Sequence, residues 1–255
     1  PLDATIFPYE IEDYVANRTH LEILYRFGGD IEILRRMIDA RLPVLLQRTY
    51  SGDGVDGWAA EYALVTGFDD FDQQVTLLTV RSGSIQEEHV TYEDLPLSWL
   101  PFGYAYFVIY PRQREADVID VLGGQFYATV NYEAALDKLM TGFHPLREER
   151  FWQGFAAATL MTYQQQYANA VIAFTQAFDT YERLPEDQRP WRIFWYNSRP
   201  YWAFYYVSDY NRVITLAEQI LESGGDRGLE ESLYWRAMAH NALGNQAGAI
   251  EDAQA

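Results

Sequence analysis

Residues 1 to about 111 mix helical and strand patterns of hydrophobic and polar positions. Helical spacing of apolar residues predicts helices over 9–16 and 30–40. Alternating or short apolar runs predict strands over 43–47, 62–67, 75–80 and 104–110. A helical start followed by successive strands predicts an α+β fold with an antiparallel sheet.

Glycine and aspartate separate these elements. Gly28 and Gly29 form a predicted turn, and Asp30 is the predicted N-cap of the helix that follows. Residues 51–57 form a predicted Gly/Asp loop, and residues 69–73 form an acidic turn between two strands.

From Gln113 onward the hydrophobic spacing is helical. It predicts a helix over 115–122, ended by Gly123 and Gly124, and another over 132–140. Beyond residue 145 it predicts helix pairs. The predicted organisation is therefore three segments: 1–111 with the sheet, 112–145 as a helical connector, and 146–255 as helix pairs.

Part of the helical pattern recurs along the chain. Small and aromatic residues occupy the spacing typical of the second helix of a tetratricopeptide repeat, and the pattern begins a third time near the C-terminus. These residues are Tyr167, Ala170, Phe174 and Ala177, then Tyr210, Val213, Ala217 and Ile220, and lastly Gly244, Ala249 and Ile250. Stacked helix pairs need small residues where helices cross closely, so the predicted arrangement is an all-α solenoid.

The composition narrows the function classes. The chain has 37 acidic and 19 basic residues, a net charge of −18, which argues against nucleic acid as a partner. Its apolar runs are shorter than the roughly 18 residues that a transmembrane helix needs. It has no cysteine, so disulfides and thiolate metal sites are excluded within these residues. Both ends have the pattern of interrupted domains, which predicts a fragment of a longer protein and leaves room for a leader segment or lipid anchor before Pro1.

Several segments, in this order, resemble the bacteriocin-processing (double-glycine leader) cysteine peptidase-like domain, followed by tetratricopeptide repeats. The matching segments are 7–10, 24–30, 43–45, 58–70 and 106–111 in the first part, and 190–196 and 230–236 in the repeats. The resemblance implies a papain-like fold for residues 1–111, whose N-terminal part, with the catalytic cysteine, would lie before Pro1.

The same resemblance implies that the catalytic positions are degenerate. Glu61 stands where the family has its histidine, framed by Tyr62 and Gly67. Arg81 stands where the family has the aspartate that orients that histidine. A carboxylate does not activate a thiol as an imidazole does. The chain is therefore predicted to have no catalytic residues.

Several single residues have a functional interpretation that competes with a structural one. Glu61 as a surrogate base or metal ligand competes with a polar residue left at a defunct site. The acidic residues, the four histidines and Ser82 do not have the spacing of a calcium loop, a paired metal site or a serine triad. No metal and no cofactor are predicted. The residues concerned are Asp53, Asp56, Asp69, Asp70, Asp72, His20, His89, His144 and His240.

Aromatic residues are dense between 191 and 210, where they serve either as the core of the repeats or as a binding surface. The first helices of the predicted pairs, 147–163, 190–206 and 229–243, are rich in Trp, Tyr and Arg, which are enriched at interface hot spots. The candidate contacts in a predicted aromatic and arginine-lined groove are Trp195, Tyr196, Arg199, Trp202, Trp235 and Arg236.

The predicted function is a catalytically inactive, peptidase-like recognition domain on a repeat scaffold, with a protein or peptide partner. One alternative is an active cysteine peptidase whose nucleophile lies upstream of Pro1. Another is a structural subunit of a larger envelope-associated complex, with peripheral membrane association. The family resemblance favours an extracytoplasmic or cell-envelope location, and the residues themselves do not fix the compartment.

Overall fold

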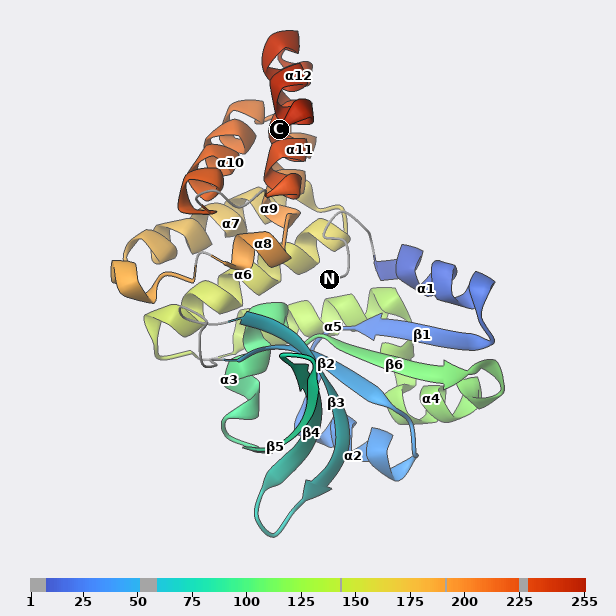
Figure 1. Cartoon of the computed structure of the whole chain (residues 1–255). Coiled ribbons are helices and arrows are strands. Elements are labelled where there is room, and N and C mark those ends of the chain that lie inside the picture. Colours follow the sequence, from blue (N-terminus) through green and yellow to red (C-terminus); the bar gives the residue numbers. More distant parts are fainter. Residues whose placement is uncertain (1–7, 51–58, 143, 191, 225–228) are drawn as a thin grey trace. The chain divides into compact units, whose positions relative to one another are not determined.

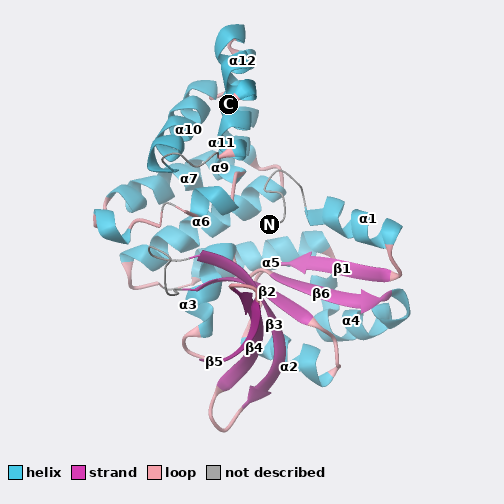
Figure 2. Cartoon of the chain, viewed as in Figure 1, coloured by secondary structure: helices cyan, strands magenta, loops and turns pink. Residues whose placement is uncertain are grey.

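The computed structural model describes the chain except for residues 1–7, 51–58, 143, 191 and 225–228. It divides into two compact units, Phe7–Ala157 and Ala158–Ala255, and the division falls inside helix α6 (Arg147–Tyr163). All described strands belong to the first unit, and the described part of the second is helical (Figures 1 and 2). The fold is therefore α+β with an antiparallel sheet, as predicted, followed by a run of helices.

The first unit contains a six-stranded antiparallel sheet with the order β1-β6-β2-β3-β4-β5. The strands are β1 (Leu21–Arg26), β2 (Val44–Tyr50), β3 (Ala59–Asp69), β4 (Gln74–Arg81), β5 (Ser84–Thr91) and β6 (Tyr106–Pro111). The patterns that predicted β2, β3, β4 and β6 are confirmed. Strands β1 and β5 were missed.

One face of the sheet forms the core beneath helix α2 (Ile31–Asp39). Ile33, Leu34 and Met37 of α2 are buried, and the helix contacts β2 and β3. Asp30 caps α2 as predicted, since its carboxylate accepts a hydrogen bond from the amide of Ile33 at 2.8 Å. The buried strand residues with side chains on this face are Val44, Leu46, Ala63, Val65, Val75 and Leu77.

The remaining helices of this unit are α1 (Pro8–Arg18), α3 (Leu95–Trp99), α4 (Glu115–Leu122) and α5 (Ala128–Thr141). Helix α1 contacts β1, and α3 contacts β2. The turn at Gly28 and Gly29 is tight: Gly28 has φ +70°, and a Cβ on Gly29 would lie 2.5 Å from the Trp99 ring. Only glycine fits both positions without rearrangement.

Helices α4 and α5 are part of the first unit, although residues 112–145 were predicted as a connector. The buried Asn131 of α5 accepts a hydrogen bond from the amide of Phe27 and donates one to its carbonyl, both at 2.9 Å. The Lys138 ammonium donates to the carbonyls of Gly28 and Gly29 at 3.1 and 2.7 Å. The change from strand to helix pattern at Pro111 is thus a change of element within one compact unit.

The second unit is built from α7 (Tyr167–Glu182), α8 (Ile193–Tyr196), α9 (Arg199–Tyr206), α10 (Tyr210–Gly224), α11 (Glu230–Ala242) and α12 (Gln246–Gln254), together with the end of α6. Contacts run from α7 to α9, α9 to α10, α10 to α11 and α11 to α12. Ala170, Phe174 and Ala177 on α7, and Val213, Ala217 and Ile220 on α10, are buried. These are the small and aromatic positions whose spacing predicted helix packing.

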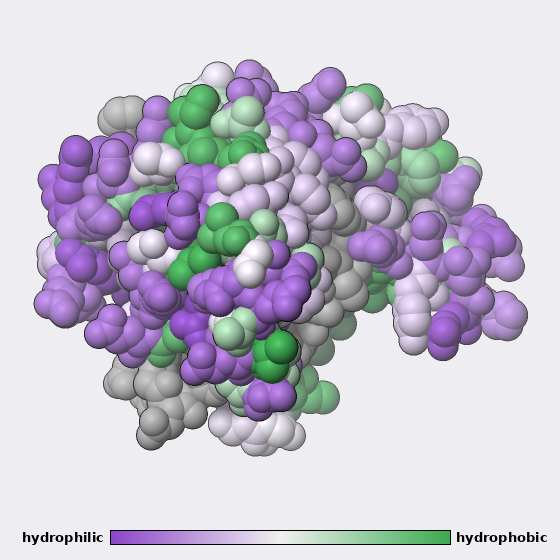
Figure 3. Space-filling view, turned by 90° about the horizontal axis from the view of Figure 1, so that it is seen from above, coloured by the Kyte–Doolittle hydropathy of each residue, from purple (hydrophilic) through white to green (hydrophobic). Residues whose placement is uncertain are grey.

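Among the described residues, every helix is too short or too polar to cross a bilayer. On the face of the molecule drawn in Figure 3, hydrophilic residues predominate, and hydrophobic residues form separate small groups among them.

Candidate functional site

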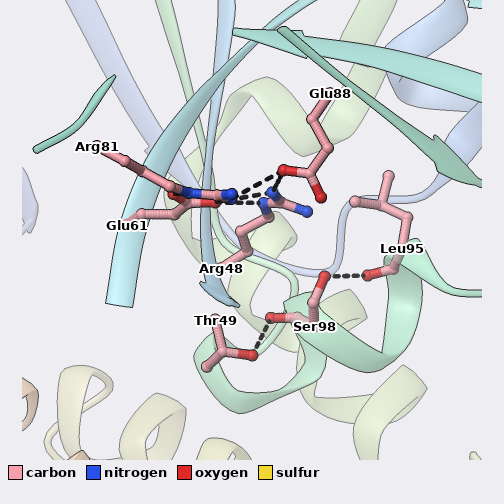
Figure 4. Close-up of polar contacts among 7 residues, drawn as sticks. All are labelled: Arg48, Thr49, Glu61, Arg81, Glu88, Leu95 and Ser98. Atoms are coloured by element: carbon pink, nitrogen blue, oxygen red, sulfur yellow. Dashed lines mark hydrogen bonds and ion pairs between the residues drawn. The ribbon is translucent and has the colours of Figure 1, made fainter. Parts of the chain in front are cut away.

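Two arginines and two glutamates form a polar cluster on the core-facing side of the sheet, on adjacent strands (Figure 4). They are Arg48 on β2, Glu61 on β3, Arg81 on β4 and Glu88 on β5. Arg48 lies directly opposite Glu61 in the β2–β3 ladder. The β3–β4 register, with Leu64 opposite Leu78, continues to place Glu61 opposite Arg81. Residues opposite each other in an antiparallel pair share a face, so these side chains meet.

The Glu61 carboxylate is the centre of this cluster. It accepts hydrogen bonds from Arg81 Nε and Nη2 at 2.8 and 2.7 Å, and from Arg48 Nε at 3.0 Å. Arg48 Nη2 lies 2.7 Å from the same carboxylate. Two guanidinium groups therefore occupy the acceptor sites of one side chain, in the fork geometry that makes such pairs strong.

Glu88 closes the cluster on the solvent side. It accepts from Arg81 Nη2 at 2.8 Å and from Arg48 Nη2. The side chains of Arg48 and Glu61 are 3% and 6% exposed, whereas those of Arg81 and Glu88 are 21% and 34% exposed. The charges of the two arginines and two glutamates cancel, which is the condition under which charged groups are tolerated in a buried position.

The cluster borders a hollow of about 290 Å³, whose lining includes Arg48, Arg81, Glu88, Val90 and Asp94. The Arg81 guanidinium also lies over the Tyr50 ring, 4.3 Å from its centroid. The Glu61 carboxylate raises the pKa of Arg81 above its ordinary value by accepting its N–H groups, so Arg81 stays charged.

The arrangement makes the Glu61 carboxylate an ion-pair acceptor. A general base needs a free acceptor site facing the proton it removes. The acceptor sites of Glu61 face two permanently charged guanidinium groups instead. The positions that the sequence resemblance assigned to the histidine and its aspartate do lie together, as Glu61 and Arg81, but they form an ion pair.

Two of the other acidic candidates, Asp69 and Asp70, have structural partners. Asp69 accepts from the amides of Phe71 and Asp72 in the β3–β4 turn, and Asp70 pairs with Arg35 at 2.6 Å. Within the described ranges, no three His, Cys, Asp or Glu side chains are grouped to hold a metal ion. Asp53 and Asp56 lie outside the described residues.

Ser82 and His89 lie apart in the β4–β5 hairpin. Ser82 has φ 51° in the tight turn that it forms with Gly83, the backbone geometry of a two-residue hairpin turn. His89 pairs with Glu87 at 3.5 Å and contacts the Thr76 hydroxyl. Neither residue is placed as a nucleophile and its base.

The six candidate contacts of the helical unit do not form a groove lined by all of them. Arg199, Trp202 and Trp235 are buried, with exposed fractions of 5%, 3% and 6%, and the two tryptophan rings pack 6.0 Å apart. The Arg199 guanidinium lies 4.5 Å from the Trp202 ring centroid and donates to the Tyr163 hydroxyl. This is a correction to the groove prediction: helix packing removes these three side chains from the surface.

The other three candidates have different outcomes. Arg236 is half-buried and pairs with the buried Asp252 through Nε at 3.0 Å. The side chains of Trp195 and Tyr196, at the end of α8, lie outside the described part of the chain. The groove prediction for these two residues therefore stays a prediction.

An aromatic and arginine-lined hollow does exist in the helical unit, but other residues build it. It has a volume of about 230 Å³, and its lining includes Phe178, Tyr181, Arg189, Phe194 and Arg212, from α7, α8, α10 and the segment after α7. The Arg212 guanidinium lies 5.7 Å from the Phe178 ring centroid, and none of the ion pairs of the described residues includes it, although Glu182 lines the same hollow.

Sequence reasoning missed Arg48 and Glu88, and also Arg212. A signal for Arg48 was present, because an arginine inside the apolar run 44–50 requires a partner carboxylate once that strand is buried. Glu88 lies on a polar strand without hydrophobic alternation, so nothing marked it. Arg212 lies on the helix whose apolar stripe was recognised, but its neighbours on α7 and α8 come from tertiary packing.

Comparison of the chain with models of known protein families, with curated proteins and with solved structures found no match.

Proposed function

We propose that this chain is a non-catalytic recognition module: a peptidase-like, papain-like unit fused to a tetratricopeptide-type helical scaffold that binds another protein. The observation that carries the proposal is the Glu61 carboxylate, held by Arg48 and Arg81 at the position where the resemblance expects a catalytic base.

The binding half of the proposal is supported by the hollow at Arg212. Arginine and aromatic side chains in a desolvated concavity are the groups that most often dominate binding energy at protein interfaces. Phe178, Phe194 and Arg212 provide this combination, and the guanidinium is available to a carboxylate or carbonyl of a partner.

A cleavage assay tests the catalytic half. The protein is incubated with peptide substrates, with and without a thiol alkylator. We expect no alkylator-sensitive turnover, since loss of the base of a nucleophile–base pair costs orders of magnitude in rate. Turnover that the alkylator abolishes would favour the alternative, an active cysteine peptidase.

The variant Glu61→His extends this assay. An imidazole between Arg48 and Arg81 would be flanked by two positive charges, which disfavour its protonated form and weaken it as a base. We therefore expect no activity from this single change. Activity from it would show that a nucleophile and oxyanion donors are in place elsewhere in the protein.

Cross-linking tests the binding half. A photoreactive residue at Gln219, which lines the hollow, is expected to capture a defined partner in the cells that produce the protein. Arg212→Met keeps the apolar stem and removes the guanidinium, so it should abolish that adduct. The matched control is Arg183→Met, an exposed arginine outside the lining, which should leave it unchanged. Equal adducts from both variants would remove the hollow from the proposal.

A further inference from the structure

Strand β5 forms an edge of the sheet. Its eight residues pair with β4 in unbroken register, from Gln74 opposite Thr91 to Arg81 opposite Ser84. In the described part of the chain no strand pairs with its other side. Ser84, Ile85, Gln86 and Glu87 are exposed. An edge of this kind offers a row of backbone donors and acceptors to any strand that adds to it.

The register shows which backbone groups face outward. The amide of Tyr92 donates to the carbonyl of Gln73 at 2.8 Å, which makes that pair a hydrogen-bonded one. Hydrogen-bonded and non-hydrogen-bonded pairs alternate along an antiparallel ladder. The even-numbered residues of β5 therefore bond to β4. Ile85, Glu87 and His89 direct their amides and carbonyls away from the sheet.

The β5 edge lacks most of the features that keep edge strands of natural proteins from pairing with other strands. Strand β5 contains no proline, no lysine and no bulge, and its register with β4 is regular over its whole length. Its only charged residues besides a histidine are Glu87 and Glu88. These acids would face each other if two copies of the chain paired in antiparallel fashion along β5, which disfavours a second copy as the occupant.

The side chains on the two faces of β5 define what a partner strand must carry. Gln86, Glu88 and Val90 lie on the face of the hollow beside Arg48 and Arg81. Ile85, Glu87 and His89 lie on the opposite face. Ile85 is 75% exposed there and pairs with Val80, which is 69% exposed. The edge thus presents one exposed acid, Glu87, to an added strand, beside the apolar surface of Ile85 and Val80.

From these observations we infer that the β5 edge binds an extended, basic peptide segment by strand addition. Backbone bonds at Ile85, Glu87 and His89 hold the segment, and a Lys or Arg side chain meets the exposed Glu87, since Glu88 is already paired with Arg48 and Arg81. The chain's net charge of −18 favours the same partner. This inference rests on the proposed protein-binding function and names the partner's chemistry.

The test uses the whole chain and a capped, fluorescent eight-residue peptide that alternates Arg with Val and Thr. We expect saturable binding by anisotropy, and slower amide hydrogen exchange at Ile85, Glu87 and His89. A peptide with Glu in place of Arg should not bind. Glu87→Gln should weaken binding about twofold to fivefold. The control Glu32→Gln, an exposed acid on α2, should leave it unchanged.

Two N-methylated peptides separate strand addition from charge attraction alone. One carries N-methyl groups on the odd residues and the other on the even residues, so their charges are identical. Only one of these sets of amides faces β5, because neighbouring residues of a strand point their amides to opposite sides. One peptide should therefore bind like the parent, and the other should lose more than about tenfold in affinity.

Several results would contradict strand addition at β5. No binding, equal affinities for the two methylated peptides, or exchange protection away from β5 would each overturn the inference. Protection of the β5 amides on concentrating the protein alone would identify a second copy as the occupant and also overturn it. Cleavage of the bound peptide would instead sink the non-catalytic function and leave strand addition intact.

Discussion

Replacing Glu61 with glutamine tests whether the buried ion cluster holds this part of the sheet together. The carboxylate is 6% exposed and accepts hydrogen bonds from both Arg48 and Arg81. A glutamine amide would turn N–H donors toward guanidinium donors. Arg48, itself 3% exposed, would keep only one ionised partner, the more solvated Glu88.

Removing one partner of a buried ion pair costs roughly 3–5 kcal/mol, because the other charge stays buried without compensation. The remaining Glu88 contact places the expected loss for Glu61→Gln at the lower end, about 3 kcal/mol. That is a large share of the roughly 5–15 kcal/mol that stabilises a typical domain.

The measurement is amide hydrogen exchange in β2 and β3 of the intact chain. Hydrogen exchange at individual amides measures the stability of these strands directly. A single unfolding curve would not, because the two compact units need not unfold together. Glu87→Gln is the matched control: the same chemical change on a side chain that is 61% exposed should cost no more than about 0.5 kcal/mol.

A double variant separates the effect of breaking the ion pair from the effect of burying charges. Arg48→Met together with Glu61→Leu removes both buried charges and should recover most of the loss, because apolar residues of similar volume replace buried pairs at little cost. If Glu61→Gln cost no more than Glu87→Gln, the cluster would be effectively solvated. Glu61 would then be available as a base.

Three further predictions concern packing and pH. Gly29→Ala should destabilise the first unit by about 2 kcal/mol, because the new Cβ meets a buried tryptophan ring, whereas Gly67→Ala, with only ordinary contacts, should be near neutral in urea unfolding. Asn131→Ala should lower the stability of the first unit by about 3 kcal/mol in hydrogen exchange, since it removes the hydrogen-bond partner of the amide and of the carbonyl of the buried Phe27. A loss of stability below about 1 kcal/mol would contradict this. Burial raises the pKa of Tyr110 to about 12, so the folded state holds this proton more tightly than the unfolded state does. Stability should be complete below about pH 10 and fall between about pH 10 and 12, and Tyr110→Phe should flatten that decline in an alkaline titration of the folded fraction.

The sequence determined the elements whose signals are local. The apolar stripe of α2, the Asp30 cap and the Gly123 terminus of α4 depend on residues within a turn of one another. The strands β2, β3, β4 and β6 were found because their buried side chains recur in short apolar runs. Strand β5 was missed because an edge strand contributes little to the core: of its residues only Val90 is buried.

The extent of the first unit was decided by tertiary contacts. Local patterns at Pro111 indicated a boundary, yet Asn131 and Lys138 bond to the backbone at residues 27–29, more than 100 positions earlier. Burial in the helical unit was decided in the same way. Trp202 and Trp235 are of a residue type that is common at interfaces. They lie in the core of the helical unit instead, because their rings pack against each other.

The sequence also singled out Glu61 and Arg81, as positions where the family resemblance implies that a catalytic pair was replaced. It did not reveal their partners. Strand register brings Arg48 and Glu88 beside them from positions up to 40 residues apart in the chain, and only that register sets which charges share a face. Hydrophobic periodicity was therefore enough to locate most of the helices and strands. The pairing of the strands made Glu61 an ion-pair acceptor, because a buried side chain interacts with the groups that the fold places around it.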